Sequence, residues 1–258
     1  MNIIVPVKQV PDLVEELEVD GSGKDLDREY LKYKINEFDD HALEEALQLK
    51  ELAGGEVTAI ALDSEGIDKT LFTAAAKGAD RLVKVTGDFP PGTSTHVAAK
   101  ALAGAISEMS YDLILTGVQA ADDRDGQLPG LLAAYLDLPQ VGVVTGVEPD
   151  GSNEGKLTVH KEYAGGLMAE LEVELPAVLG IQAARETPRY APVSRVRQMM
   201  KKTKIDEIAA KDSDATAGST VSRVFKPDKG AGAEMLEGSP EAIVDKLVAV
   251  LKEKGITA

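Results

Sequence analysis

The sequence contains no cysteine, no tryptophan and only three histidines, and aromatic residues make up 4% of its 258 residues. Without cysteine the chain has neither a disulfide framework nor a thiolate metal site, and a cysteine nucleophile is excluded. Three histidines scattered along the sequence argue against a histidine-rich metal site. So few aromatic rings also leave little surface on which single-stranded bases could stack.

Positive charge is scarce as well, because 28 Lys and Arg stand against 44 Asp and Glu, a formal net charge of −16. Nucleic acids and anionic membranes are bound through clustered cations, so we expect neither as a partner. The sequence begins without a basic region followed by an apolar stretch, and no run reaches membrane-spanning length. We therefore expect a cytoplasmic protein without membrane insertion, whose partners are other proteins or small molecules.

Strand-like and helix-like segments alternate as far as residue 138. Apolar runs predict buried strands at 2–10, 57–62, 81–85 and 113–115. Helical periodicity predicts helices that begin near Phe38, Ser64, Ser94 and Leu131. Asp39 or Asp40 is the expected cap of the first helix, and Ser64 that of the second. This alternation is typical of an α/β fold with a doubly wound, mostly parallel sheet and helices on both faces.

After Pro139 the alternation stops. Strand patterns follow at 141–147, 156–163, 168–175 and 177–181. Asp150-Gly151 and Gly165-Gly166 are typical of turns, so these strands are expected to form antiparallel hairpins. The hairpins either extend the parallel sheet or form a small sheet of their own. We assign residues 1–185 to one α/β domain, and we expect any small-molecule ligand to bind there, at the carboxyl ends of the parallel strands.

Residues 186–258 have the composition of an extended C-terminal arm. A basic run at 194–204 is typical of a solvated helix face, and residues 211–220 have the composition of a linker. Residues 221–226 predict an isolated strand, and Ser239-Pro240 begins a final helix. Because a lone strand and helix cannot bury their apolar faces, we expect them to dock on another subunit.

Residues 111–130 carry the clearest sign of a ligand site. A buried strand leads into a loop with Gly117 and Gly126 and then into a helix, which leaves backbone N–H groups free to bind a phosphate. The loop has neither of the usual phosphate-binding glycine motifs. Its acidic cluster would repel phosphate unless those carboxylates cap N–H groups or meet ribose and adenine. A plain connection between strand and helix remains an equal alternative.

Six segments, in order, resemble the β subunit of electron transfer flavoproteins, heterodimers that carry electrons from flavin dehydrogenases to a quinone reductase. The resemblance spans nearly the whole chain. The segments are 5–11 (VPVKQVP), 35–50 (INEFDDHALEEALQLK), 76–81 (AKGADR), 112–123 (DLILTGVQAADD), 159–176 and 188–191 (PRYA).

The resemblance implies a buried AMP in this subunit and a redox FAD held mainly by the α subunit. It assigns the cofactor-binding positions to Pro6, Asn36, Glu37, Phe38, Asp39, Leu62, Gly117, Gln119, Ala120, Asp122, Asp123, Gly126, Gln127 and Leu128. Phe38 falls where the family places an aromatic ring against the flavin. No side chain is implied to be catalytic, since the flavin does the redox work and the protein is an electron carrier.

Two departures from the family pattern bear on the ligand. Leu128 stands where the family often has a hydroxyl residue that holds phosphate. A loop of this sort, without the hydroxyl, resembles that of the electron-bifurcating branch, in which a second FAD replaces AMP. The hairpin around Glu162 is more similar to the non-bifurcating branch, although Ala164 replaces an acid there. AMP is the first choice on this resemblance, and a second FAD is the alternative.

The resemblance also implies a partner-recognition loop at 188–204, which docks on dehydrogenases such as acyl-CoA dehydrogenases. Its apolar anchor would be Val193, and Glu162 would pair with the mobile flavin domain. The surrounding cations suit electrostatic steering of a partner; they are Arg195, Arg197, Lys201 and Lys202.

Two other classes of function compete with the carrier. An adenine-nucleotide sensor or hydrolase would share the core, but its phosphate site would need a cation that the loop offers only as Arg124. A purely structural partner would never touch flavin.

Overall fold

The computed structural model describes residues 1–29, 31–123, 125–151, 155–211, 221–228, 230 and 232–256. The chain divides into two compact units, Met1–Val224 and Phe225–Ala258. Arg124 and almost all of the predicted linker at 211–220 lie outside the described residues. Among the described helices, none is long and apolar enough to cross a bilayer.

The first unit is built around a nine-stranded sheet with the order β11-β5-β4-β1-β6-β10-β7-β8-β9. Strands from β11 to β7 run parallel to their neighbours, whereas β8 and β9 pair antiparallel. The strands are β1 (Asn2–Pro6), β4 (Glu56–Leu62), β5 (Arg81–Thr86), β6 (Leu113–Gly117), β7 (Gln140–Pro149), β8 (Lys156–Tyr163), β9 (Leu167–Glu174), β10 (Ala177–Ile181) and β11 (Ile205–Ala209).

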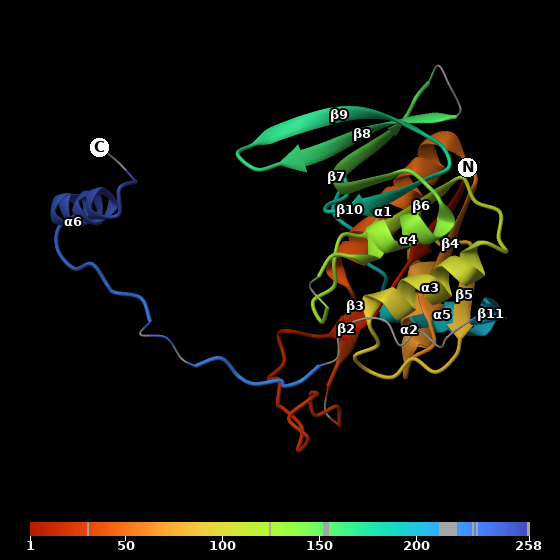
Figure 1. Ribbon diagram of the computed structural model, residues 1–258, viewed down its shortest axis with the longest axis horizontal. Coiled ribbons are helices and arrows are strands. Elements are labelled where there is room, and N and C mark those ends of the chain that lie inside the picture. The colour runs from red at the N-terminus through yellow and green to blue at the C-terminus, as the bar shows by residue number, and fades with distance from the viewer. Residues whose placement is uncertain are drawn as a thin grey trace. The chain divides into compact units, whose positions relative to one another are not determined.

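Helices cover both faces of the parallel part, which confirms the predicted fold class (Figure 1). One core lies between the sheet and α1 (Glu37–Ala53) and α2 (Ile67–Lys77), with α5 (Val193–Lys202) packed on α2. The other lies beneath α3 (Thr95–Ile106) and α4 (Leu128–Leu136). Side chains of β6 alternate between the two, since Leu113 and Leu115 join the first core and Ile114 the second.

The predicted hairpins extend the parallel sheet, and they do so out of sequence order. After β9 the chain returns through β10, which lies between β6 and β7 and runs parallel to both. Only β8 and β9 then stand outside the parallel part, as the green ribbon of Figure 1 shows.

Several predicted boundaries were wrong. The first strand ends at Pro6, and residues 9–11 form β2 (Gln9–Pro11), which pairs with β3 (Tyr33–Ile35) in a small antiparallel sheet. Asn36, rather than Asp39 or Asp40, precedes α1, and Gly66 rather than Ser64 precedes α2.

The C-terminal region differs most from the prediction. Residues 221–226 form no strand, whereas Ile205–Ala209 form the edge strand β11, which the sequence analysis missed. The final helix, α6 (Pro240–Glu253), begins as expected, with the Ser239 hydroxyl accepting from the N–H of Ala242. None of the described residues of α6 is buried within its own unit.

Candidate nucleotide-binding site

A small pocket lies where β1 and β6 end and where α1 and α4 begin. Ligands of open α/β sheets bind at such carboxyl ends of strands. The pocket is lined by Lys8, Asn36, Asp39, Gly117, Gln119, Ala120, Asp123, Gly126, Gln127 and Leu128.

Asp39 forms the floor of this pocket and joins three elements. Its carboxylate accepts a 2.8 Å hydrogen bond from the N–H of Lys8, after β1, and a 3.2 Å bond from the N–H of Gly117, at the end of β6. Burial raises the pKa of the Asp39 carboxyl to about 7, although the N–H donors and the nearby Asn36 and Lys8 side chains oppose that shift.

Gly117 is required by the close approach of α1 to β6. A Cβ at residue 117 would lie 2.4 Å from Oδ1 of Asp39 and 2.8 Å from the backbone of α1. Any larger residue would therefore push the start of α1 away from the sheet. The absence of a side chain at Gly117, the last residue of β6, is thus explained by close packing on the Asp39 carboxylate as well as by access for a ligand.

Asn36 ties the start of α1 to the loop. Its side-chain N–H₂ group donates a 2.8 Å hydrogen bond to the carbonyl of Gln119, and its backbone N–H donates to the carbonyl of Lys8. The Asn36 side chain is 2% exposed. It makes no helix-capping bond, so its role is to hold residues 8 and 119 on either side of the pocket.

The acidic residues of the loop already bind groups of the same chain. Asp122 lies 2.8 Å from the Lys8 ammonium, and Asp123 accepts from the N–H of Ala120. Asp125 accepts from the Thr95 hydroxyl and from the N–H of Gln127. Burial raises the pKa of the Asp123 carboxyl, and Lys8 opposes that shift. The carboxylates therefore shape the loop and need not face a phosphate.

The N-terminus of α4 opens on the same pocket. Within the described residues no side chain caps this helix, and Pro129 stands in its first turn. The first intrahelical bond that follows the cap runs from the N–H of Leu131 to the carbonyl of Gln127. The helix start consequently presents its positive end toward the pocket, a suitable place for an anionic group.

A larger cleft, of about 480 Å³, lies beside the ends of β4 and β5. Its walls include Asp63, Glu65, Asp68 and Asp88, with Lys84 as the one cation among its described lining residues. Lys84 is already paired with Asp68 at 3.2 Å and Glu207 at 3.3 Å. With four carboxylates among its described lining residues, against Asp39 and Asp123 in the smaller pocket, this cleft suits a phosphate less well.

Comparison with known proteins identifies the family. A model of the electron transfer flavoprotein domain matches residues 25–213. The chain is 33% identical to the electron transfer flavoprotein subunit beta of Methylophilus methylotrophus, over 98% of each chain. It is 34% identical to the same subunit of Thermoanaerobacterium thermosaccharolyticum, over 95% of this chain and 86% of that one, and 30% identical to that of Bacillus subtilis, over 98% of each. The chain belongs to the electron transfer flavoprotein β subunit family.

Nine of the fourteen residues expected to hold a cofactor line the small pocket at the ends of β1 and β6. Asp122 stands beside it through its ion pair with Lys8. The remaining four expected residues are not among its lining: Pro6 is buried at the end of β1, Glu37 is exposed, and Phe38 and Leu62 are half-buried.

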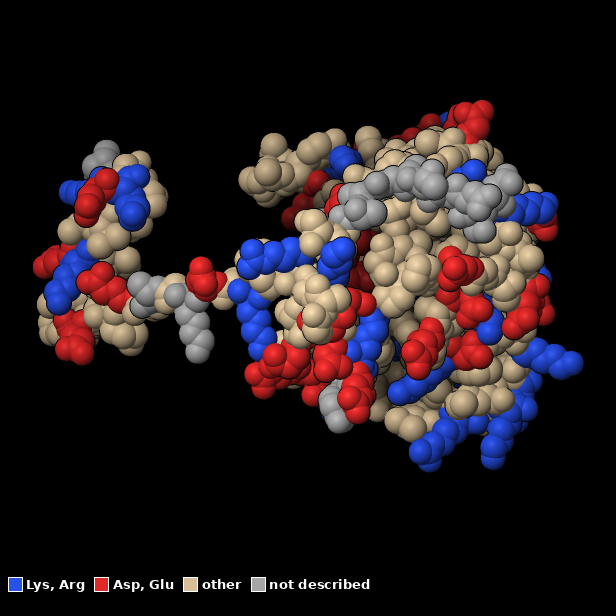
Figure 2. All heavy atoms as spheres, turned by 60° about the horizontal axis from the view of Figure 1, so that its bottom comes forward, with Lys and Arg blue, Asp and Glu red and all other residues tan. Residues whose placement is uncertain are grey.

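The expected partner-binding residues lie on the surface of the flavoprotein chain. Val193 is the first residue of α5 and is 60% exposed. Within the described residues, none of the four cations of this helix forms an ion pair; they are Arg195, Arg197, Lys201 and Lys202. Glu162 is exposed on β8, opposite Met168 of β9. On the face drawn in Figure 2, acidic and basic side chains are interspersed over much of the surface, and several basic side chains gather at the lower right edge.

Sequence reasoning missed two residues of the pocket region. Lys8 lies in the segment 5–11 that carried the family resemblance, but its charge was not connected with a loop more than 100 positions away. Thr95 lies at the helix start predicted near Ser94, and its hydroxyl donates to Asp125, a contact that the helical pattern does not indicate. The excess of aspartate in the loop was the signal that could have prompted a search for a cation.

Proposed function

We propose that this chain is the β subunit of a heterodimeric electron transfer flavoprotein. It binds a structural AMP in the pocket between β1 and β6 and helps to hold the FAD of an α subunit. The heterodimer carries electrons from flavin dehydrogenases, such as acyl-CoA dehydrogenases, to a quinone oxidoreductase or another acceptor. Bound flavin supplies the redox chemistry, and the chain is a carrier subunit rather than an enzyme.

The observation that carries this proposal is the convergence of three distant segments on one pocket. Lys8, Asn36 and the loop from Gly117 to Leu128 are separated in sequence but share hydrogen bonds at its walls. The pocket combines an uncapped helix start, a lysine and Gly126 at a positive φ of 63°. These are the groups with which a protein binds a phosphate without a glycine motif.

Apolar surface on the chain supports a protein partner. The turn between β8 and β9 exposes Tyr163, Leu167 and Met168, and α6 exposes Val244 and Leu247. Apolar groups gathered in this way are typical of interfaces. We therefore propose that the hairpin end and α6 dock on the α subunit, and that Val193 and the surrounding cations meet dehydrogenases.

The decisive experiment is release of bound small molecules from the co-purified heterodimer, with AMP and FAD quantified by chromatography. We expect one FAD and one AMP per heterodimer. Two FAD and no AMP would replace the AMP assignment with a second redox flavin. A colourless heterodimer would contradict the proposed electron transfer altogether.

Lys8 provides a sharper test of the pocket. In the heterodimer, Lys8→Gln should weaken AMP binding about tenfold, because a charge-assisted hydrogen bond to phosphate is lost. Lys34→Gln is the matched control, since Lys34 forms a similar exposed ion pair with Asp12 at 3.1 Å, away from the pocket lining. Equal AMP affinities of the two variants would remove Lys8 from the site.

The isolated chain gives a further check. Because most of the FAD contacts are proposed to come from the α subunit, the chain alone should bind flavin weakly or not at all and should be stable only with that subunit. Tight stoichiometric FAD on the isolated chain would argue against AMP in the pocket.

A further inference from the structure

One face of α1 fastens the segment that leads from the sheet to α5. His41, Glu44 and Glu45 lie on neighbouring turns of the helix, where side chains three or four residues apart share a face. His41 accepts a 3.2 Å hydrogen bond from the N–H of Ala184. Glu45 accepts from both the N–H and the Nε of Arg185, each at 3.0 Å. Residues 184 and 185 are thus attached before the chain reaches α5.

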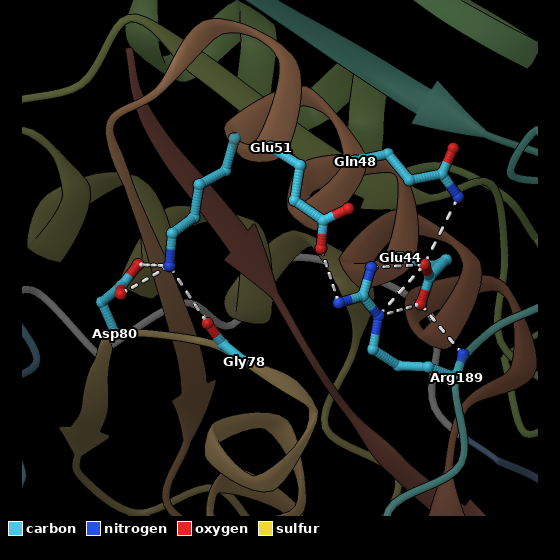
Figure 3. Close-up of polar contacts among 7 residues, drawn as sticks. Glu44, Gln48, Glu51, Gly78, Asp80 and Arg189 are labelled. Atoms are coloured by element: carbon cyan, nitrogen blue, oxygen red, sulfur yellow. Dashed lines mark hydrogen bonds and ion pairs between the residues drawn. The ribbon is translucent and has the colours of Figure 1, made fainter.

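Arg189 makes the last and most extensive of these attachments. Its Nη2 and Nε donate to the two carboxylate oxygens of Glu44 at 2.8 Å and 2.9 Å, and its backbone N–H donates to Glu44 at 2.9 Å (Figure 3). Nη1 donates to Glu51 at 2.8 Å. Gln48 also donates to Glu44, at 3.4 Å. The guanidinium is therefore held by two carboxylates that lie about two turns apart on α1.

The Glu44 carboxylate is 5% exposed, so its charge requires a partner. Although burial works in the opposite direction, the hydrogen bonds from Arg189 hold the pKa of Glu44 below its usual value. A bidentate pair with a buried carboxylate fixes the position of the arginine backbone more tightly than an exposed ion pair does.

Helix α5 begins only four residues after Arg189, at Val193. The inner side of α5 is anchored by Val196, which is buried, and by Met199, which packs against the core. Its outer side presents Val193 and the free cations. The bonds of Arg189 therefore fix where α5 starts, and the inner contacts fix which face it exposes.

We propose that Arg189, held by Glu44 and Glu51, is a positioning residue for dehydrogenase docking. It places Val193 as an apolar anchor with Arg195 and Arg197 beside it, a surface that fits a partner with an apolar pocket and an acidic rim. The inference rests on the proposed function, because it assigns a part in partner recognition to residues that touch neither flavin nor nucleotide.

The test compares three variants of the heterodimer. Arg189→Gln removes the bidentate pair, and Arg189→Lys retains the charge. Lys50→Gln is the matched control, because Lys50 also lies on α1 but binds Asp80 and the carbonyl of Gly78 instead of the segment before α5 (Figure 3). Each variant is assayed as electron acceptor for an acyl-CoA dehydrogenase supplied with its acyl-CoA, and amide hydrogen exchange is followed in residues 193–202.

In Arg189→Gln we expect the KM for the flavoprotein to rise about tenfold while kcat stays within about twofold, because docking is impaired and the flavin is not. Exchange in residues 193–202 should become faster, and FAD content should not change. Arg189→Lys should recover part of the KM, and Lys50→Gln should match the unmodified protein.

An unchanged KM together with unchanged exchange in Arg189→Gln would overturn the inference. A fall in kcat and FAD content with no change of KM would also overturn it, since that pattern belongs to general loss of structure. If the unmodified heterodimer accepts no electrons, the proposed function and the docking role both fail, and faster exchange in Arg189→Gln would still establish the attachment of α5 to α1.

Discussion

Two of the buried carboxylates of helix α1, Asp39 and Glu44, lie in opposite electrostatic settings. Asp39 meets backbone N–H groups and an amide, and burial raises its pKa to about 7. Glu44 is equally buried, but hydrogen bonds from Arg189 hold its pKa below the usual value against the effect of burial. Burial raises the free energy of a charged carboxylate in both places, but at Glu44 the hydrogen bonds, chiefly those from the Arg189 side chain, outweigh that effect. The start of the helix thus places a carboxyl with a raised pKa beside the ligand pocket, and its middle forms an ionic attachment.

The largest effect is expected at Glu45, a third carboxylate of α1, which is fully buried. Glu45 accepts from the N–H of Val147 and from Arg185, so Glu45→Ala should lower the free energy of unfolding by about 3–5 kcal/mol, because it leaves a partly buried arginine unpaired. Glu51→Ala, which removes an exposed carboxylate of the same helix, should cost less than about 1 kcal/mol. Urea denaturation measures both, and similar losses would show that burial of the partner does not matter here.

Gly117 tests how closely α1 must approach β6. Because its added Cβ would meet Asp39 and the backbone of α1, Gly117→Ala should destabilise the protein by about 1–3 kcal/mol and reduce bound nucleotide. Gly130→Ala is the control, since its Cβ would meet nothing within 4 Å and alanine favours the helix α4. Thermal unfolding and nucleotide release decide the matter, and equal behaviour of both variants would contradict the close approach.

Asp39 should make the free energy of unfolding depend on pH. Its carboxyl binds the proton more tightly in the folded state, with a pKa of about 7, than in the unfolded state, where the value is 3.8. The stabilisation that protonation provides is therefore complete below about pH 4 and is lost as the pH rises through about 7. Between about pH 5 and about pH 8 the contribution should fall by roughly 2 kcal/mol.

Asp39→Asn, which does not titrate, provides the reference for that slope. The free energy of unfolding of the unmodified protein minus that of the variant should decrease with rising pH over this interval. A difference that stays constant from acid to alkaline pH would show that Asp39 does not titrate there.

Glu44 should give the opposite and smaller pH dependence. Its lowered pKa means that the contribution of the Arg189 pair is present above the unfolded value of 4.5 and is lost as the pH falls through the lower folded value. The stability difference between the unmodified protein and Arg189→Gln should hence be present at neutral pH and disappear in acid. Chemical denaturation across that range checks it, and a difference that grows in acid would refute the ionic attachment.

Local patterns in the sequence predicted much of this architecture. The alternation of apolar strands and amphipathic helices to residue 138, the Ser239-Pro240 helix start and the glycine loop after β6 are all recorded within a few neighbouring residues. Periodicity and turn chemistry act over such distances, so these features could be read without a structure. The family resemblance added the list of pocket residues, most of which lie together.

The sequence by itself determined the fold class, the segments that face the core and the loop that carries the candidate site. Only the tertiary structure placed β10 between β6 and β7, joined β11 to β5, brought Lys8 to the aspartates of the loop and paired Arg189 with Glu44. Strand order and ion pairs between distant segments depend on how all the elements pack at once. No local pattern records that packing, because each partner lies far away along the chain.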